Sequence, residues 1–368
     1  MSAETPARRV DPGASTAEVR HLGVPSRLAD LGIDRALAFR VDLTVRFRGI
    51  EVREGVLLHG PSGWGEWSPF WDYDAVEAST WLRAGIETAT RPLPQPRRGL
   101  VPVNATVPVV DPDRATRIVA ESGCTTAKVK VADPRSTLAE DCRRVAAVRA
   151  ALGGEGRVRV DANAAWGVDE ALSAITELEA AAEGLEYVEQ PCATVDNLAR
   201  VRRQATVPIA ADESVRRAAD PLAVARAGAA DLLVVKAQPL GGLERALDVI
   251  DAAGLPVVVS SALDTSVGIG LAAHLAAALP ELDHACGLAT LRLVRADVCT
   301  DPLLPVDGML TPRRAEVDAE PMDADDDLCP RWATRLTESL AVLDGGTGPA
   351  GPGTTAGGAT DDRGRMPR

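Results

Sequence analysis

Residues 126–131 read TAKVKV, and four runs of the same kind follow along the chain: RVRVDA (157–162), LEYVEQ (185–190), VPIAAD (207–212) and DLLVVK (231–236). Each run is short, mostly apolar and carries an ionisable side chain near its end. Such runs are typical of buried parallel strands. Three further runs extend the series at its two ends: VPVNATV (101–107), PVVVSS (256–261) and HACGLA (284–289).

The eight runs recur with the period of a β/α unit. Residues near their ends are Asn104, Lys128, Asp161, Glu189, Asp212, Lys236, Ser260 and Gly287, and the steps between them are 24, 33, 28, 23, 24, 24 and 27 residues. Helical patterns lie between the runs; the clearest covers residues 138–152 and stops at Gly153 and Gly154. We therefore predict an α/β fold of the TIM-type (β/α) barrel class, with a doubly wound sheet as the alternative.

The regions on either side of the barrel have other patterns. From Ala36 to Trp71 apolar and polar residues alternate, which predicts an antiparallel hairpin or meander, and a helical pattern follows over residues 75–88. After the barrel, a last helix containing Trp332 is expected to pack on the N-terminal region. Residues 1–33 and the glycine-rich residues 344–368 are expected to be disordered, because they offer too little apolar surface to offset the entropy of ordering.

Composition and charge exclude several classes of function. The net charge is −13 with a pI near 4.9, which opposes binding to nucleic acids or anionic membranes. The sequence has no apolar stretch long enough to span a membrane and no signal peptide, so we expect a cytoplasmic location. Six cysteines without a CxxC pair indicate buried thiols in a reducing compartment. The oligomeric state is not indicated.

Three carboxylates fall at the ends of neighbouring predicted strands: Asp161, Glu189 and Asp212. The carboxyl ends of barrel strands carry the working residues, so these side chains should converge. Converging carboxylates repel one another and need a cation, and an all-oxygen set favours Mg²⁺ or Mn²⁺ over Zn²⁺. Asn163 is placed to orient Asp161 by hydrogen bonding. Alternatively, each acid pairs with a lysine or caps the next helix.

The lysines of the series suggest acid–base chemistry. Lys128 and Lys130 alternate with valines, so both amines should point into the barrel, and Lys236 approaches from almost the opposite side. Adjacent cations and a nearby metal should lower the pKa of a lysine and make its neutral form accessible. A proton could then be handled on either face of a bound substrate. A pair of surface lysines on an edge strand is the alternative.

The segment from Ser260 through Ser261 to Ser266 is small and polar at the end of a predicted strand. Its backbone N–H groups and hydroxyls suit the binding of a substrate carboxylate. The same segment could instead serve as the N-cap of the next helix.

Together, these motifs resemble the enolase superfamily, in its muconate-lactonizing subgroup. The matching elements are Lys128-x-Lys130, Asp161-x-Asn163, Glu189-Gln190-Pro191, Asp212-Glu213-Ser214 and Lys236. The resemblance implies a barrel of the modified (β/α)7β kind over residues 101–300 and a capping α+β domain built from residues 34–100 and 301–343. It also implies a Mg²⁺ cofactor held by the three acids and supported by Asn163 and Glu213, with Lys130, Lys236 and Lys128 as the catalytic lysines.

Within that subgroup the chain is similar to the o-succinylbenzoate synthase family, through residues 39–73, SSALDTSVG (260–268) and the run from Cys286 that includes Gly287. This similarity implies a magnesium-dependent lyase of menaquinone biosynthesis that dehydrates 2-succinyl-6-hydroxy-2,4-cyclohexadiene-1-carboxylate. Its substrate would contact Ser260, Ser261 and Gly287. The alternatives are an N-acylamino-acid racemase or dipeptide epimerase, a muconate cycloisomerase, and an inactive barrel that serves as a scaffold.

Overall fold

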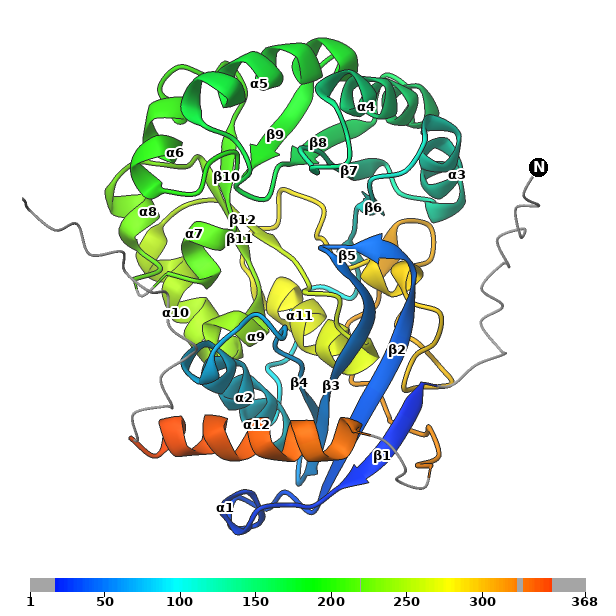
Figure 1. Ribbon diagram of the computed structural model, residues 1–368, viewed down its shortest axis with the longest axis vertical. Helices are drawn as coiled ribbons and strands as arrows, with labels where there is room; N and C mark the ends of the chain where they lie inside the picture. Colours follow the sequence, from blue (N-terminus) through cyan, green and yellow to red (C-terminus); the bar gives the residue numbers. More distant parts are fainter. Residues whose placement is uncertain (1–16, 219, 323–326, 346–368) are drawn as a thin grey trace, which may run out of the picture.

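A computed structural model describes residues 17–345, apart from residue 219 and residues 323–326. It consists of a barrel and a capping part that lies beside the barrel mouth (Figure 1). The barrel strands form one parallel sheet in the order β12-β11-β10-β9-β8-β7-β6. Their bounds are β6 Ala105–Val107, β7 Thr126–Lys130, β8 Arg157–Asp161, β9 Leu185–Glu189, β10 Ile209–Ala211, β11 Leu232–Val235 and β12 Val257–Val259. The predicted barrel class is confirmed.

Helices follow the strands and cover the outside of the sheet, as Figure 1 shows. They are α3 Pro112–Ser122, α4 Leu138–Leu152, α5 Val168–Ala182, α6 Val195–Arg202, α7 Glu213–Arg216, α8 Ala223–Arg226, α9 Ala237–Leu240, α10 Leu243–Ala253 and α11 Ser266–Ala278. The best-predicted helix, α4, begins with a capping box in which Thr137 and Glu140 bond each other's backbone N–H groups, and it ends at Gly153 with a positive φ of 74°.

The eighth predicted run does not form a full strand. Cys286 bridges Val103 and Gly287 bridges Ser260, both in the parallel sense, so two isolated bridges close the barrel between its first and seventh strands. A short 3-10 helix, η1 (Thr290–Leu293), follows. The eighth unit is thus reduced, as the resemblance implied.

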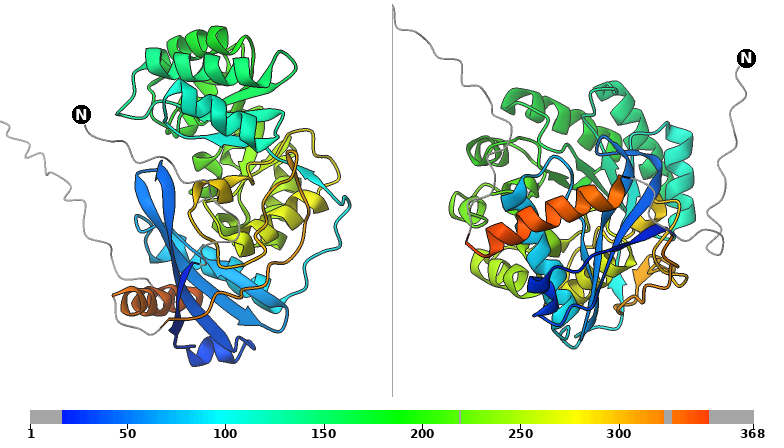
Figure 2. Two further views of the ribbon diagram at one scale, coloured as in Figure 1. Left: turned by 90° about the vertical axis from the view of Figure 1, so that its right-hand side faces the viewer. Right: turned by 60° about the horizontal axis from the view of Figure 1, so that its bottom comes forward.

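The capping part is an antiparallel sheet with helices packed on it. Its elements are β1 Glu18–Leu22, α1 Ser26–Ala29, β2 Arg35–Phe47, β3 Ile50–Gly60, β4 Gly63–Trp67, α2 Ala75–Thr90 and α12 Leu328–Leu343. Helix α12 packs directly against α2 (Figure 2). It also packs on the sheet, where Trp332 meets the ring of Trp67 of β4 edge-on, with 5.2 Å between the ring centroids. A two-stranded ribbon of β5 (Val101–Pro102) and β13 (Met309–Leu310) joins the regions before and after the barrel.

The expectation that residues 1–33 form a loose tail is wrong for the described residues 17–33. Strand β1 pairs with β2 from Glu18 to Leu22, and Val19 and Leu28 are fully buried. Long-range pairing with an edge of the sheet orders this segment despite its unremarkable composition. Residues 1–16 and 346–368 lie outside the described residues, and the predicted domain boundaries stay a prediction.

None of the described helices is long and apolar enough to cross a membrane. All six cysteines lie in the described part of the chain and are free thiols; four are buried, as expected, while Cys142 and Cys329 are half-buried.

The capping sheet is tied to the barrel through buried polar groups. Glu66 of β4 accepts hydrogen bonds from the backbone N–H groups of Thr265 and Gly268 at the start of α11. Arg53 of β3 donates to the carbonyl oxygen of Leu263 at 3.1 Å. On the other side, Glu87 of α2 accepts from the first backbone N–H groups of α10. The loop that leaves β12 is therefore held by the capping sheet.

Within the capping part, α2 lies so close to β4 that only glycine fits at the contact. A Cβ atom at Gly65 would lie 2.0 Å from the carbonyl oxygen of Gly85. Gly65→Ala should therefore push α2 away from the sheet and lower the free energy of unfolding by roughly 1–3 kcal/mol or more. Gly99→Ala is the matched control, because a Cβ there meets nothing within 4 Å. Equal melting temperatures for the two variants would contradict this packing.

The buried carboxyl of Glu66 makes stability depend on pH. Burial and the neighbouring Asp264 raise its pKa to about 7, so the folded chain holds this proton more tightly than the unfolded chain. The resulting stabilisation is complete below the unfolded pKa near 4.5 and is lost as the pH rises toward 7. Glu66→Gln should remove this loss, which amounts to at most ~1.4 kcal/mol per pH unit. Urea unfolding at several pH values gives the free energy of unfolding as a function of pH. If this dependence is the same for wild type and variant, the prediction is wrong.

Candidate active site

The structure brings the predicted acids and lysines together at the carboxyl ends of the barrel strands. Lys128 and Lys130 lie on β7, and Asp161 and Glu189 are the last residues of β8 and β9. Asp212 and Lys236 directly follow β10 and β11. The parallel register places Lys130 opposite Asp161 and Asp161 opposite Glu189. The acids and lysines thus form one layer across the barrel mouth.

Lys130 is the least buried of the three amines, with 15% of its side chain exposed. Its Nζ lies 2.5 Å from Oδ2 of Asp161 and 2.8 Å from Oδ1 of Asn163. The Asn163 backbone N–H donates to the other oxygen of Asp161 at 3.0 Å. Asn163 therefore touches both the lysine and the acid that it was expected to orient.

Lys128 lies deeper and bonds to both oxygens of Glu189, at 3.0 and 3.1 Å. It is also 3.4 Å from Asp161. Burial opposes the charge on Lys128, but the two carboxylates outweigh this effect and raise the lysine pKa above its usual value. The two carboxylate partners therefore hold Lys128 as an ammonium group. That a nearby metal and adjacent cations lower the pKa of a lysine stays a prediction.

Lys236 forms an ion pair with Asp212 on the far side of the mouth. Burial lowers the pKa of Lys236, and the attraction of Asp212 offsets this only in part. Asp212 also accepts from Arg216 at 3.0 Å, and the pKa of Asp212 is lowered to about 2 because these cations outweigh burial. Arg216 in turn bonds Glu213 at 2.6 Å. Burial therefore makes Lys236 easier to deprotonate than an exposed lysine.

The three acids have the chemistry of a divalent-cation site. They are buried and supply oxygen alone, and burial together with the charges of Asp161 and Asp212 raises the pKa of Glu189 to about 7. A cation at this point would relieve that repulsion. Among the described residues, no three such side chains stand close enough to hold a metal as they are placed, because ammonium groups lie between the carboxylates. One carboxylate oxygen of Glu213 is buried without a partner in the described structure.

The loops that leave the barrel strands are conformationally strained at this end. Non-glycine residues with positive φ follow four of the strands: Ala132, Asn163, Ala164, Gln190 and Leu263. Gln190 accepts from the backbone N–H groups of Asp212 and Ser214 and donates to the Ser214 hydroxyl, so it links the loops after β9 and β10. Strained backbone is retained where the surroundings hold it in place, commonly at functional sites.

The predicted substrate-binding segment is also buried at this end, but its donors are in use. The backbone N–H of Ser260 donates to the carbonyl oxygen of Val235, and that of Ser261 donates to the carbonyl oxygen of Gly287. The backbone N–H of Gly287 donates to the carbonyl oxygen of Val259. The Ser261 hydroxyl lies 2.7 Å from the hydroxyl of Thr290. A Cβ at Gly287 would lie 2.4 Å from the Ser260 hydroxyl oxygen, so the close approach requires glycine.

The turn between β2 and β3 reaches the barrel mouth from the capping sheet. The ring centroid of Phe47 lies 5.2 Å from Nζ of Lys130. Tyr73, which follows β4, accepts hydrogen bonds from Arg48 at 3.1 Å and from Arg216. These cap residues were not singled out from the sequence, because their approach to the barrel is set by tertiary packing.

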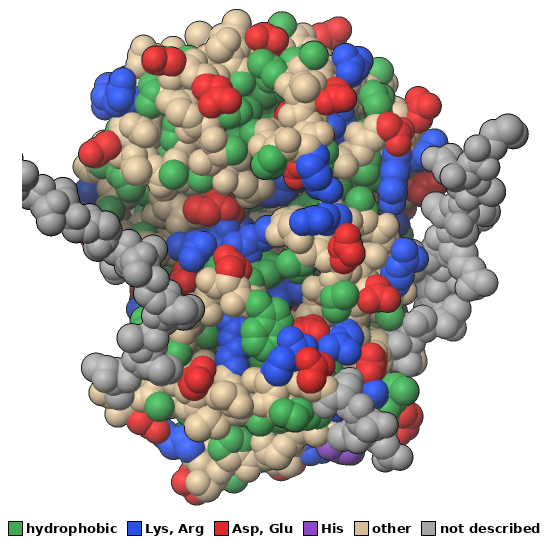
Figure 3. Space-filling view, viewed as in Figure 1, with side chains coloured by type: hydrophobic (Ala, Val, Ile, Leu, Met, Phe, Trp, Pro, Cys, Tyr) green, Lys and Arg blue, Asp and Glu red, His purple; other side chains and the backbone are tan. Residues whose placement is uncertain are grey.

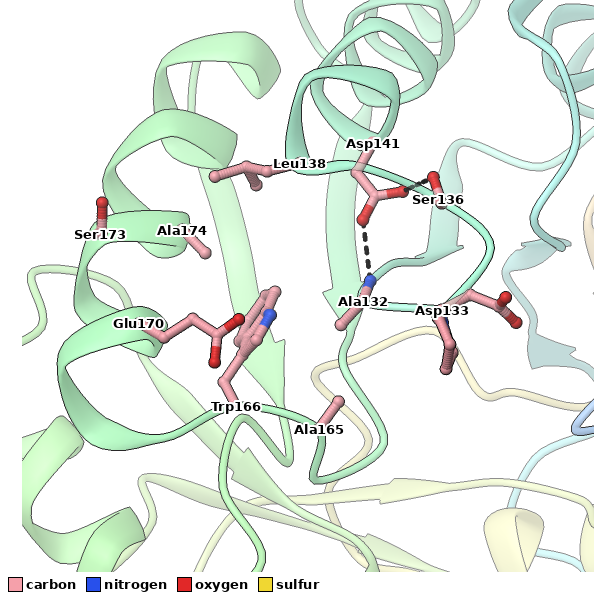
Figure 4. Close-up of a pocket in the computed structure, with 11 residues that line it drawn as sticks. Ala132, Asp133, Ser136, Leu138, Asp141, Ala165, Trp166, Glu170, Ser173 and Ala174 are labelled. Carbon is pink, nitrogen blue, oxygen red and sulfur yellow. Dashed lines mark hydrogen bonds between the residues drawn. The ribbon is translucent and has the colours of Figure 1, made fainter.

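A separate cavity of about 420 Å³ lies outside this layer, between the loops after β7 and β8 and the starts of α4 and α5 (Figure 4). None of the predicted site residues lines it. Within it, Asp141 accepts from the backbone N–H of Ala132 and the hydroxyl of Ser136, and so fixes the loop that follows the two lysines of β7.

The distribution of lysines along the sequence is a further signal for the site. The chain contains only three lysines, Lys128, Lys130 and Lys236, and arginine supplies every other basic side chain apart from histidine. All three lysines lie in this one layer. Lysine differs from arginine in having a pKa that a protein can bring within reach, so its confinement to one place is itself a sign of proton chemistry.

Comparisons with known proteins agree with this architecture. Residues 111–316 match the family described as enolase C-terminal domain-like, and residues 38–89 match the one described as enolase N-terminal domain-like. In fold, the chain resembles the L-Ala-D/L-Glu epimerase from Bacillus subtilis, with a TM-score of 0.65 and 24% identity over 78% of this chain and 98% of that one. It also resembles the muconate lactonizing enzyme from Pseudomonas fluorescens, with a TM-score of 0.63 and 21% identity over 83% of this chain and 96% of that one.

Similarity in sequence is higher to one group of enzymes. The o-succinylbenzoate synthase of Thermobifida fusca (strain YX) is 57% identical over 306 residues, which cover 83% of this chain and 96% of that protein. That of Mycobacterium tuberculosis (strain ATCC 25177 / H37Ra) is 51% identical over 293 residues, covering 79% and 88%. The chain therefore belongs to the o-succinylbenzoate synthase family of the enolase superfamily.

Proposed function

We propose that this chain removes water from 2-succinyl-6-hydroxy-2,4-cyclohexadiene-1-carboxylate and so forms 2-succinylbenzoate for menaquinone biosynthesis. The observation that carries the proposal is the layer of buried carboxylates flanked by amines on both sides, in a chain more than 50% identical to o-succinylbenzoate synthases. Its location in the cytoplasm stays a prediction.

Lys130 is assigned the role of base. Its amine is the most exposed of the three and faces the mouth between Asp161 and the Phe47 ring. The proton on the carbon beside the substrate carboxylate moves to Lys130 Nζ. The electron pair of the broken C–H bond becomes part of the ring as the bond from the neighbouring carbon to its hydroxyl oxygen breaks. The departing hydroxide takes up the proton now on Lys130, or one from Lys236, and leaves as water. The product ring is aromatic, which supplies much of the driving force.

Lys128 is assigned an electrostatic role in that step, and Lys236 is assigned either an electrostatic role or the return of a proton. Lys128 keeps its proton because Glu189 and Asp161 raise its pKa, so it is a fixed positive charge below the reacting carboxylate. Lys236 lies on the opposite side and faces the substrate ring as a cation or returns a proton to the departing hydroxide. Its lowered pKa is compatible with proton return.

Enzymes of the enolase superfamily depend on Mg²⁺, and the donor set fits this ion. Asp161, Glu189 and Asp212 would hold it, with Asn163 bonded to Asp161 and Glu213 bonded to Arg216 and Asn163 behind them. When bound, the ion would neutralise the negative charge that develops on the substrate carboxylate.

The proposed reaction destroys the cyclohexadiene chromophore. With Mg²⁺, the full chain should convert the substrate, and the ultraviolet absorbance of the diene should fall; excess EDTA should stop the reaction, and added Mg²⁺ should restore it. No loss of absorbance, combined with deuterium exchange at the α-carbon of N-succinyl amino acids in D₂O, would contradict the proposal and favour an epimerase.

Replacement of the proposed base should separate chemistry from metal binding. Lys130→Ala should lower kcat at least 10³-fold, because general bases contribute about 10²–10⁴-fold and this one starts the reaction. Isothermal titration should still detect Mg²⁺. Lys130→Arg is the matched control: it keeps the positive charge but cannot accept a proton near neutral pH, so it should be equally inactive. Substantial turnover by either variant would refute the assignment.

A further inference from the structure

The proposed substrate carries two carboxylates, and the acid and lysine layer accounts for only one of them. The ring carboxylate is the one beside the proton that is removed. The succinyl carboxylate extends away from the ring, so it needs a second group of donors. A buried or half-buried carboxylate without donors would weaken binding considerably.

The barrel loop after β12 offers few donors for this second carboxylate. The backbone N–H groups of Ser260, Ser261 and Gly287 already donate to carbonyl oxygens, and that of Ala262 lies 3.3 Å from a carboxylate oxygen of Asp264. Asp264 adds a buried acid beside the loop. The hydroxyls of the two serines remain, but they too lie next to carbonyl oxygens.

The capping side of the mouth has the opposite character. Lys and Arg side chains gather in a band between the barrel and the capping part on the face shown in Figure 3, although the whole chain carries a net charge of −13. Such a local positive field attracts anionic substrates and concentrates them at the opening.

Arg48 is a cation on the capping side of the mouth, and its contacts suit it to bind a ligand. It lies in the β2–β3 turn with a positive φ of 50°, directly after Phe47, whose ring faces Lys130. Its guanidinium stacks 4.0 Å from the ring centroid of Phe70 and donates to the Tyr73 hydroxyl. The carboxylate nearest to it is Asp72, at 3.8 Å on an exposed side chain, which is too long for a strong hydrogen bond.

The position of Arg48 relative to the site is fixed from two directions. On one side, the adjacent Phe47 contacts the proposed base. On the other, Tyr73 accepts from both Arg48 and Arg216, and Arg216 bonds Asp212. The stacking on Phe70 and the hydrogen bond to Tyr73 hold the planar fork in one orientation, which lowers the entropy lost when it binds a carboxylate.

We propose that Arg48 binds the succinyl carboxylate of the substrate and thereby selects substrates with a second carboxylate. This inference rests on the proposed function and names the specificity residue of the same site. Phe47 then lies beside the substrate ring, and the β2–β3 turn is the part of the cap that binds the succinyl group of the substrate.

The test compares two ligands and four proteins, each as the full chain with Mg²⁺. Isothermal titration measures the affinity for 2-succinylbenzoate and for 2-butanoylbenzoate, which has a methyl group in place of the second carboxylate. Wild type should prefer 2-succinylbenzoate. Arg48→Met keeps the apolar contact with Phe70 and should weaken binding of 2-succinylbenzoate about 10–100-fold, while binding of 2-butanoylbenzoate changes little. The affinity of Arg48→Lys for 2-succinylbenzoate should lie between those of wild type and Arg48→Met.

Arg46→Gln is the matched control, since it removes the same charge from an exposed position of β2, two residues before Arg48, and it should leave both affinities within about twofold. In turnover assays Arg48→Met should raise KM with a smaller effect on kcat. If Arg48→Met binds both ligands as wild type does, the inference is wrong. If wild type fails to convert the cyclohexadiene substrate at all, the proposed function is wrong instead.

Discussion

The buried layer of alternating charges at the barrel mouth is the constraint on which the rest of the structure depends. Four carboxylates, Asp161, Glu189, Asp212 and Glu213, meet four cations, Lys128, Lys130, Lys236 and Arg216. The formal charges cancel, which is how so many ionised groups can be buried together. Removing any one of them would leave an uncompensated charge. Binding a divalent cation must likewise shift the positions or protons of its neighbours.

The cap is joined to this layer by polar contacts as well as by apolar packing. Arg53 and Glu66 hold the loop after β12, and Tyr73 connects the cap to Asp212 through Arg216. A displacement of the capping sheet would therefore move both the carboxylates and the loop that contains Ser260. This explains why two sequence segments separated by the whole barrel, β1–α2 and α12, are packed into one supporting body.

The sequence predicted the barrel well because its signals are local and repeated. Five of the strands are apolar runs with an ionisable end, and the alternation of Lys128 and Lys130 with valines is enough to direct both amines inward. The sequence did not predict β1, whose order comes from pairing with β2, or the hairpin-turn residues Phe47 and Arg48 as parts of the site. The raised pKa of Lys128 also needed the structure, because it depends on the distances from its amine to Glu189 and Asp161.

Chemistry and substrate choice are placed on different parts of the fold by this arrangement. The charged barrel residues are bound to one another in a neutral array, so a change in any of them disturbs its partners. Loss of one partner of a buried ion pair lowers the free energy of unfolding by about 3–5 kcal/mol. Arg48 is under no such restriction: its contacts are two aromatic rings, one hydroxyl and a distant, exposed Asp72. Substitution in the β2–β3 turn can thus alter which carboxylates are accepted while the proton-transfer layer stays intact. The cap is therefore the part of this fold in which the choice of substrate can change with the least disturbance of the charged layer.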